Sequence, residues 1–317
     1  MENKENNIFE HIDCPVCDGN SFKTVLKFTP DEFLNEERKK YYNVDVLGVD
    51  LKTNFFIKKC KKCGFVFVNP RLRKDLYNVV YNEAKSGQYE MKSWMFDSGD
   101  IGNLFATYNK YREVFPLLNV LIYFGKYFEK PKNDAYKQLK LLDYGCGMGH
   151  ILDLCKTFGI KGIGVDIDSF RLNHCKQKGL DARLPEELPD AEKFHIVIST
   201  SVVEHVNDLD AYFKYISSRL IKGGIFYFNG LNPRIIEIER KKRLFKIVMP
   251  LEHINYFTRK TLLMLAEKYG FEEAKGGGYG VFAMKNSIQY SYPFLKRFIF
   301  KGFYPTGNFE VTLEKKS

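Results

Sequence analysis

Short apolar runs alternate with amphipathic stretches along the second half of the chain. The runs are typical of buried strands and occupy residues 139–144, 163–167, 180–184, 195–199 and 225–229. Helical stretches lie between them at 150–158, 169–177 and 209–220, and glycines at 159, 179 and 223–224 would end these helices. Strands that alternate with helices predict a parallel sheet covered by helices on both faces, which is an α/β fold.

The segments on either side of this region follow other patterns. Residues 65–68 are strand-like, whereas residues 71–137 carry apolar positions mainly at helical spacing. After residue 230, an irregular stretch precedes a predicted helix at 258–269, a strand near 271–275, an aromatic-rich segment and a final strand at 309–314. We therefore predict three units: a small module at 1–70, a helical connector or lid at 71–137, and the α/β domain at 138–317.

A glycine-rich turn joins the first strand of the α/β domain to its first helix. Asp143 stands at the end of the strand, and Gly145, Gly147 and Gly149 alternate with other residues before the helix begins. Glycines suit a place where the chain turns sharply and a ligand approaches the backbone, and the helix behind them presents unpaired N–H groups. The pattern therefore predicts a ligand at this turn, with a plain loop as the alternative.

A second pair of acidic residues follows the next strand. Asp166 lies 23 positions after Asp143, and a carboxylate at about this distance can bind both hydroxyls of a ribose. The alternative is that Asp166 or Asp168 only caps the following helix. We favour Asp166 as the ligand and Asp168 as the cap.

The glycine turn resembles the first motif of the class I S-adenosylmethionine-dependent methyltransferases, an apolar strand that ends in Asp-x-Gly-x-Gly-x-Gly. Three later segments also match this family, at 203–206, 220–224 and 252–258, whereas His195 departs from its usual Phe-Asp. The resemblance implies a Rossmann-like sheet of seven strands, mostly parallel with an antiparallel last strand. It also implies S-adenosylmethionine (SAM) as cofactor, with these contacts: Asp143 near the ammonium group, Gly145, Gly147 and Gly149 along the methionine portion, Asp166 on the ribose and Ile167 against the adenine.

Two histidines lie where this fold places the methyl acceptor. His205 comes just past the fourth strand, and His253 precedes the late helix. Histidine is the side chain best suited to act as a base near neutral pH, and a base is needed when the acceptor is a hydroxyl or an acidic carbon. We take both as candidate catalytic bases; the alternative is that each only orients its loop through hydrogen bonds.

Two Cys-x-x-Cys pairs flank the N-terminal module, Cys14 with Cys17 and Cys60 with Cys63. Four thiolates close the tetrahedral shell of a structural Zn²⁺, and unrelated cysteines are the alternative. The 42 residues between the pairs exceed the compact spacing of zinc sites, so we expect an insertion. The segment from Cys60 to Pro70 resembles the N-terminal zinc-binding module of bacterial methyltransferases in sugar and polysaccharide pathways. That resemblance implies a zinc-ribbon-like module and an acceptor from sugar metabolism.

The charge of the chain bears on its partners. With 49 Lys+Arg against 39 Asp+Glu the net charge is +10, and 28 Phe and 20 Tyr exclude an aromatic-poor disordered protein. Residues 1–100 carry no net charge, whereas residues 230–317 carry +8. A zinc module that binds RNA should be basic, so this distribution argues against nucleic acid and favours a small anionic acceptor. The basic run 239–246 is either a solvated helix face or a site for the acceptor's phosphates.

These observations predict SAM-dependent methyl transfer to a small molecule, such as a sugar, a nucleotide-sugar or a related anionic metabolite. The alternatives are an RNA methyltransferase that grips RNA with its zinc module and a SAM-binding regulator without catalysis. The first residues lack the apolar stretch of a signal peptide, and the apolar window 114–125 is too short to span a membrane, so we expect a cytoplasmic protein. The aromatic segment 290–304 would be core, a pocket lid or a weak membrane-surface contact.

Overall fold

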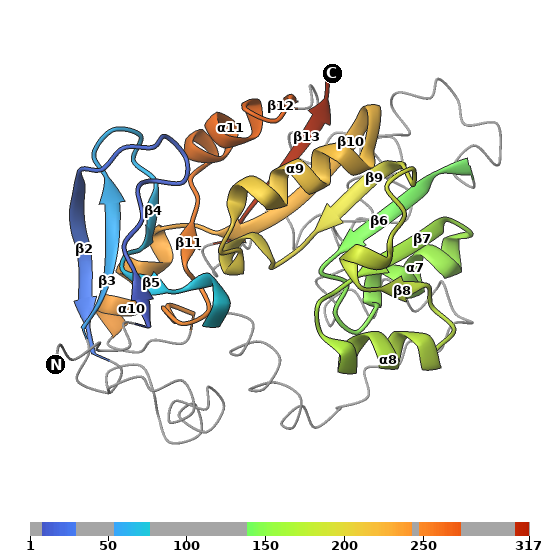
Figure 1. Ribbon diagram of the computed structural model, residues 1–317, viewed down its shortest axis with the longest axis horizontal. Helices are drawn as coiled ribbons and strands as arrows, with labels where there is room; N and C mark the ends of the chain where they lie inside the picture. The colour runs from blue at the N-terminus through green and yellow to red at the C-terminus, as the bar shows by residue number, and fades with distance from the viewer. Residues whose placement is uncertain (1–7, 30–53, 77–137, 243–246, 274–307, 317) are drawn as a thin grey trace, which may run out of the picture.

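The computed structural model describes residues 8–29, 54–76, 138–242, 247–273 and 308–316 (Figure 1). Most of the predicted connector, from residue 77 onwards, and the aromatic segment 290–304 lie outside these residues. Within the described part of the chain, no helix is long and apolar enough to cross a membrane.

A sheet of seven strands forms the larger half of the molecule, in the order β12-β13-β10-β9-β6-β7-β8. Five of these strands run parallel to one another: β6 (Lys140–Tyr144), β7 (Lys161–Val165), β8 (Ala182–Arg183), β9 (Phe194–Ser199) and β10 (Leu220–Leu231). The sheet is completed by β13 (Asn308–Lys315), antiparallel to β10, and by β12 (Phe271–Glu273), antiparallel to β13. The predicted α/β fold with a parallel sheet is confirmed.

Helices follow the strands as the alternating pattern predicted. They are α7 (His150–Phe158), α8 (Ser169–Gln177), α9 (Leu209–Arg219), α10 (Arg234–Lys242) and α11 (Arg259–Glu267). Gly159 ends α7 in the left-handed conformation, with φ 68°, where an L side chain would be strained. Asp168 caps α8 by accepting from the N–H groups of Phe170 and Arg171, which confirms its predicted role as a cap.

A second sheet lies beside the first, in the order β11-β4-β3-β2 (Figure 1). Its N-terminal members are β2 (Phe22–Phe28), β3 (Phe55–Cys60) and β4 (Val66–Val68), all antiparallel. The fourth, β11 (Asn255–Tyr256), comes from the segment between β10 and α11 and pairs antiparallel with β4. The prediction that this segment is irregular is therefore wrong in two places, because it also contains α10.

The N-terminal module continues slightly beyond its predicted end. A two-stranded ribbon joins β1 (Phe9–Glu10) to β5 (Arg71–Leu72). Residues 71–72 are therefore strand, at the start of the segment predicted to be mainly helical. The guanidinium of Arg71 donates to the carbonyl of Asn207 at 2.7 Å and so ties this ribbon to the turn that follows β9.

One apolar cluster runs from the N-terminal module into the α/β domain. It includes Cys14 and Phe65 on one side and Phe257 and Leu262 on the other, all at most 1% exposed. The rings of Phe65 and Phe257 lie 4.7 Å apart between centroids, close enough for a favourable aromatic pair. Shared burial of this kind couples the folding of the two parts.

Candidate active site and candidate metal centre

The glycine turn lies at the carboxyl ends of β6 and β9, where the strand order changes direction and open α/β sheets bind ligands. All three glycines have positive φ, but for different reasons. A Cβ on Gly145 would lie 2.3 Å from Cγ2 of Val202, and one on Gly149 would lie 2.7 Å from Leu180. At Gly147 a Cβ would meet a single atom, at 4.0 Å. Packing therefore explains Gly145 and Gly149, whereas the space at Gly147 fits the approach of a ligand.

Asp166 connects the glycine turn to the start of α8. It is 7% exposed, and its two carboxylate oxygens accept from the N–H groups of Gly147 at 2.8 Å and Asp168 at 3.0 Å. The next residue, Ile167, is 48% exposed although it is a large apolar side chain. An anchored carboxylate beside an uncovered apolar surface fits the ribose and the base of a nucleoside. Asp143, at 2% exposure, lies on β6 where that strand meets the turn.

A short 3₁₀ turn, Val203–His205, follows β9 and faces the segment before β11. Glu204, His205 and His253 each offer a nitrogen or oxygen atom here, and these atoms lie within 4.8 Å of one another. The two imidazole rings are 4.5 Å apart between centroids. The structure thus brings together the two histidines that the sequence analysis placed on separate segments.

Backbone groups hold both imidazole rings. Nδ1 of His205 lies 3.1 Å from the carbonyl of Glu252, and Nδ1 of His253 bonds the carbonyl of Ile247. A carbonyl only accepts, so each Nδ1 carries the proton of its bond and Nε2 of the neutral ring keeps its lone pair. Hydrogen bonds that orient the loops, which were the alternative to a catalytic role, are therefore present at both histidines.

Glu204 is a functional candidate that the sequence analysis missed. It is 3% exposed, and its Oε2 has no hydrogen-bond partner among the described residues. Burial raises the pKa of this carboxyl to about 7. The signal that could have revealed it is the Glu-His dipeptide after the fourth strand, within the segment 203–206.

The chain matches the model of a known family over more than half its length. The family is described as a methyltransferase domain, and the match spans residues 108–274. The chain belongs to this family. The glycine turn lies within the matched region, so it is part of a methyltransferase domain.

Named relatives of the methyltransferase share a shorter part of it. The ubiquinone biosynthesis O-methyltransferase of Pelagibacter ubique is 36% identical over 104 residues, which is 30% of this chain and 43% of that protein. The protein of the same name from Brucella anthropi is 35% identical over 103 residues, 30% of this chain and 42% of that one. The chain thus spans less than half the length of the curated relatives it matches.

Solved structures of methyltransferases resemble it only distantly. A SAM-dependent methyltransferase from Archaeoglobus fulgidus has 20% identity and a TM-score of 0.40, covering 68% of this chain and all of the other. The plantazolicin methyltransferase BamL has 13% identity and a TM-score of 0.48, covering 67% of this chain and 89% of the other.

The four cysteines of the N-terminal module of the methyltransferase come together. Their sulfur atoms all lie within 4.8 Å of one another, with Cys14 and Cys63 at 3.5 Å and Cys17 and Cys60 at 3.6 Å. Four sulfurs around one zinc ion at about 2.3 Å would be about 3.8 Å apart, so the cluster is the right size for the ion. Although burial opposes it, N–H groups of Cys63 and Lys62 lower the pKa of the Cys60 thiol to about 7, which favours the thiolate there, whereas burial raises the pKa of the Cys14 and Cys63 thiols.

The two cysteine pairs sit on matching turns. The N–H of Asp18 donates to the carbonyl of Cys14 at 2.8 Å, and the N–H of Gly64 donates to that of Cys60 at 3.0 Å. Asp18 and Gly64 both have positive φ, 57° and 86°. Each pair is therefore folded back on itself so that both of its sulfurs face the other pair.

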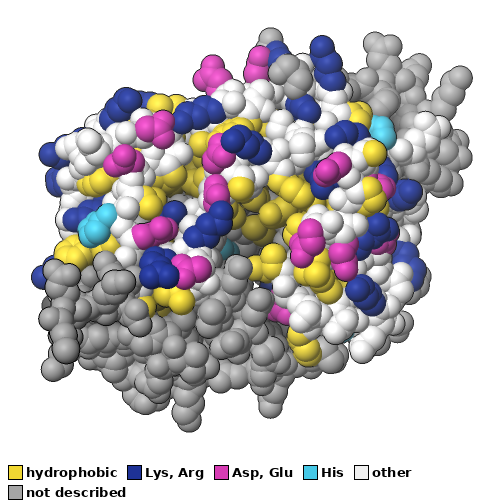
Figure 2. Space-filling model, viewed as in Figure 1, with side chains coloured by type: hydrophobic (Ala, Val, Ile, Leu, Met, Phe, Trp, Pro, Cys, Tyr) yellow, Lys and Arg dark blue, Asp and Glu magenta, His cyan; other side chains and the backbone are white. Residues whose placement is uncertain are grey.

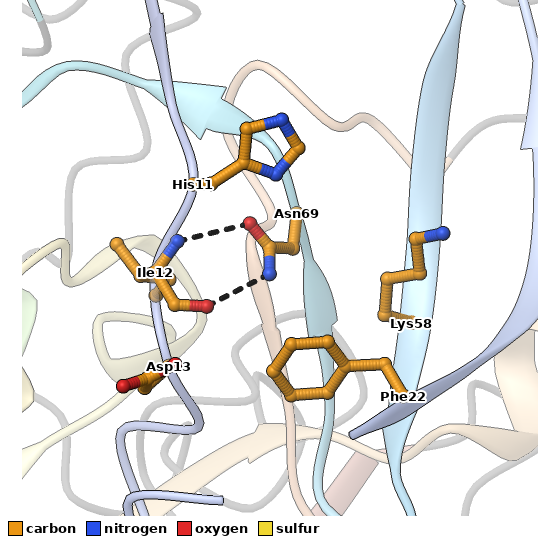
Figure 3. Close-up of a pocket in the computed structure, with 6 residues that line it drawn as sticks. All are labelled: His11, Ile12, Asp13, Phe22, Lys58 and Asn69. Carbon is orange, nitrogen blue, oxygen red and sulfur yellow. Dashed lines mark hydrogen bonds between the residues drawn. The ribbon is translucent and has the colours of Figure 1, made fainter. Parts of the chain in front are cut away.

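A surface pocket of about 360 Å³ lies elsewhere on the N-terminal module (Figure 3). Its lining residues are His11, Ile12, Asp13, Phe22, Lys58 and Asn69. The side chain of Asn69 bonds both the N–H and the carbonyl of Ile12, at 3.2 and 2.9 Å. The pocket shares no lining residue with the glycine turn or the histidine pair, so we assign it no part in methyl transfer.

Proposed function

We propose that the enzyme transfers the methyl group of SAM to a hydroxyl oxygen of a small anionic metabolite, a sugar or nucleotide-sugar being the leading candidate. One contact carries this proposal: Val202 packs against Gly145 and so sets the turn with Glu204 and His205 directly beside the glycine turn. A base beside the cofactor suits a hydroxyl acceptor, which must lose its proton. The similarity to proteins named as O-methyltransferases supports the choice of oxygen.

The cofactor would lie along the glycine turn with its ribose on Asp166 and its adenine against Ile167. When bound, SAM supplies an electrophilic methyl group on a sulfonium. Gly147 is the position where the backbone is open to it, and the buried carboxylate of Asp143 would attract its ammonium group. These residues bind and orient, and orientation alone can supply much of the rate enhancement.

His205 and His253 would receive the acceptor's proton in this proposal. Both present Nε2, since Nδ1 of each is bonded to a backbone carbonyl. The carbonyl bonds hold the rings in one tautomer and one orientation, as a third group does in other base-assisted reactions.

Charge supports a small anionic acceptor over a polymer. The excess of +8 in residues 230–317 follows the strands that end at the proposed acceptor site. Figure 2 shows basic and acidic side chains interspersed over the visible face. Within the run 239–246, Glu239 does not face solvent, because its buried carboxylate accepts from the N–H groups of Ile247 and Val248.

The cysteine cluster would hold a structural Zn²⁺ through Cys14, Cys17, Cys60 and Cys63. All four are at most 9% exposed, as expected for a closed shell with no position for substrate. The proposed role of the ion is to stabilise the N-terminal module, whose strand β4 pairs with β11.

A labelled-product search tests the function. We expect enzyme supplied with ¹³C-methyl SAM to label a small anionic compound in a cell extract, and a His205→Asn variant to lower the yield by at least about 100-fold while still binding SAM. Mass spectrometry of small-molecule and RNA fractions measures both. Label in RNA would support the RNA methyltransferase instead, and tight SAM binding with no labelled product in either fraction would support the regulator.

A further inference from the structure

Glu204, His205 and His253 make a ligand set that acid-base catalysis alone does not require. We propose that these three side chains form a second metal site, separate from the four cysteines, which binds a divalent transition-metal ion such as Zn²⁺ and through it the oxygens of the acceptor. The cation site stands on its own geometry, whereas its use in acceptor binding rests on the proposed function.

The donor atoms suit such an ion in kind and in spacing. Two imidazoles and one carboxylate are a known ligand set of catalytic zinc sites, and imidazole favours transition metals over Mg²⁺ or Ca²⁺. The three atoms lie within 4.8 Å of one another. Ligands bonded at about 2.0–2.2 Å in a tetrahedral shell lie about 3.3–3.6 Å apart, so side-chain movements of about 1 Å would complete the bonds.

The carboxylate supplies an independent reason to expect a cation. Glu204 is 3% exposed, and no described residue donates to its Oε2. Within the described part of the chain, no ion pair involves this side chain. Burying a carboxylate without a partner is costly, and a metal ion would compensate that cost.

The histidines are arranged as metal ligands are. Metal-bound imidazoles almost always donate their other ring N–H to a carbonyl or carboxylate, which fixes the ring and raises its basicity. His205 and His253 each have such a bond from Nδ1, to the carbonyls of Glu252 and Ile247. Nε2 of each ring is then the ligand atom.

The segment that carries His253 is held firmly in place. The N–H of Ile254 donates to the carbonyl of Glu204 at 2.8 Å, and its carbonyl accepts from the N–H of Val68 at 2.9 Å. The side-chain amide of Asn255 donates to the carbonyls of Val203 and Val206 at 3.0 and 2.7 Å. Such fixation of the ligand-bearing backbone is what a preformed metal site needs.

Three protein ligands leave at least one position on the ion open, as in catalytic zinc sites. An acceptor with two neighbouring oxygens, such as a vicinal diol, would bind there through one oxygen, or through both if the ion takes a fifth ligand. The bound acceptor would be oriented toward the glycine turn. Bound to the ion, a hydroxyl releases its proton to water more readily, because the positive charge lowers its pKa. With the ion bound, the histidines hold it and the proton passes to water; without the ion, they are the bases of the proposed function.

Cobalt titration tests the site on the whole protein with zinc already in the cysteine cluster. We expect one further equivalent of Co²⁺ to bind, with the weak visible absorption of a nitrogen and oxygen shell and without the intense thiolate-to-cobalt band. Glu204→Gln and His253→Asn should each weaken that binding at least about tenfold. Asn retains a donor near the position of Nδ1 but lacks Nε2, so the bond to Ile247 can persist. The control His174→Asn, on α8, should bind like wild type.

SAM calorimetry on the same samples separates this proposal from the proposed function. The variants should bind SAM as wild type does, which also shows that they are folded. No additional Co²⁺ in wild type, or equal Co²⁺ binding by wild type and both variants, would overturn the metal site and leave the methyltransferase intact. Co²⁺ binding without SAM binding would contradict the proposed cofactor turn and leave the metal site standing.

Discussion

Replacing Cys60 with alanine is expected to remove stoichiometric zinc and to lower the free energy of unfolding by several kcal/mol. A structural zinc site of this kind contributes about 10–16 kcal/mol of binding free energy, and three thiolates hold the ion much less well than four. Because β4 of the module pairs with β11, two residues beyond His253, methyl transfer should fall by about 100-fold. Metal analysis, thermal unfolding and the labelled-product assay measure these changes.

A matched variant controls for the loss of a buried cysteine. Cys155 is 1% exposed on α7 and lies outside the cysteine cluster. Cys155→Ala should keep the full zinc content and most of the activity. Unchanged metal content in Cys60→Ala, or equal losses of metal in both variants, would show that the cluster does not hold the ion.

Replacing Gly145 with alanine is expected to weaken SAM binding at least about 30-fold. Its φ of 79° is strained for an L side chain by about 1–2 kcal/mol, and the new Cβ would lie 2.3 Å from Val202. Overpacking of this kind costs about 1–3 kcal/mol more, so the glycine turn must shift. Calorimetric titration with SAM measures the effect.

Two further variants separate strain from collision at this turn. Gly179 has a φ of 68° and no atom within 4 Å of a built Cβ, so Gly179→Ala has the backbone strain alone and should bind SAM normally. Adding Val202→Ala to Gly145→Ala removes the colliding methyl groups and should restore part of the affinity. If Gly145→Ala binds SAM like wild type, the turn is not where the cofactor lies.

The local pattern of apolar runs, capping residues and glycines predicted most strands and helices of the α/β domain. Helix α8 begins and ends where the sequence indicated, because Asp168 caps it at one end and Gly179, with a φ of 68°, follows the other. The continuous apolar run of β9 indicated a strand buried on both faces, and the consecutive residues Ile196, Val197 and Ile198 are indeed fully buried. These elements depend on signals within about ten residues, which one sequence contains.

Long-range pairing could not be predicted in the same way. β11 has only two residues, and it exists because Asn255 and Tyr256 find β4 almost 190 positions earlier. Nothing near it in the sequence signals a strand. The approach of His253 to Glu204 and His205 depends on the same pairing. No local motif reveals it, so the sequence showed two separate histidines and gave no reason to single out Glu204.

A crystal structure with S-adenosylhomocysteine tests the central claim most directly, since it shows where the acceptor must stand. The account predicts the ribose on Asp166 and the sulfur beside Gly145 and Val202. Glu204, His205 and His253 should face the sulfur across a space that admits one acceptor group. In the complex with SAM, the acceptor oxygen in this space would be about 3–3.5 Å from the methyl carbon. A sulfur that points away from these three side chains, or a ribose held by residues other than Asp166, would contradict it.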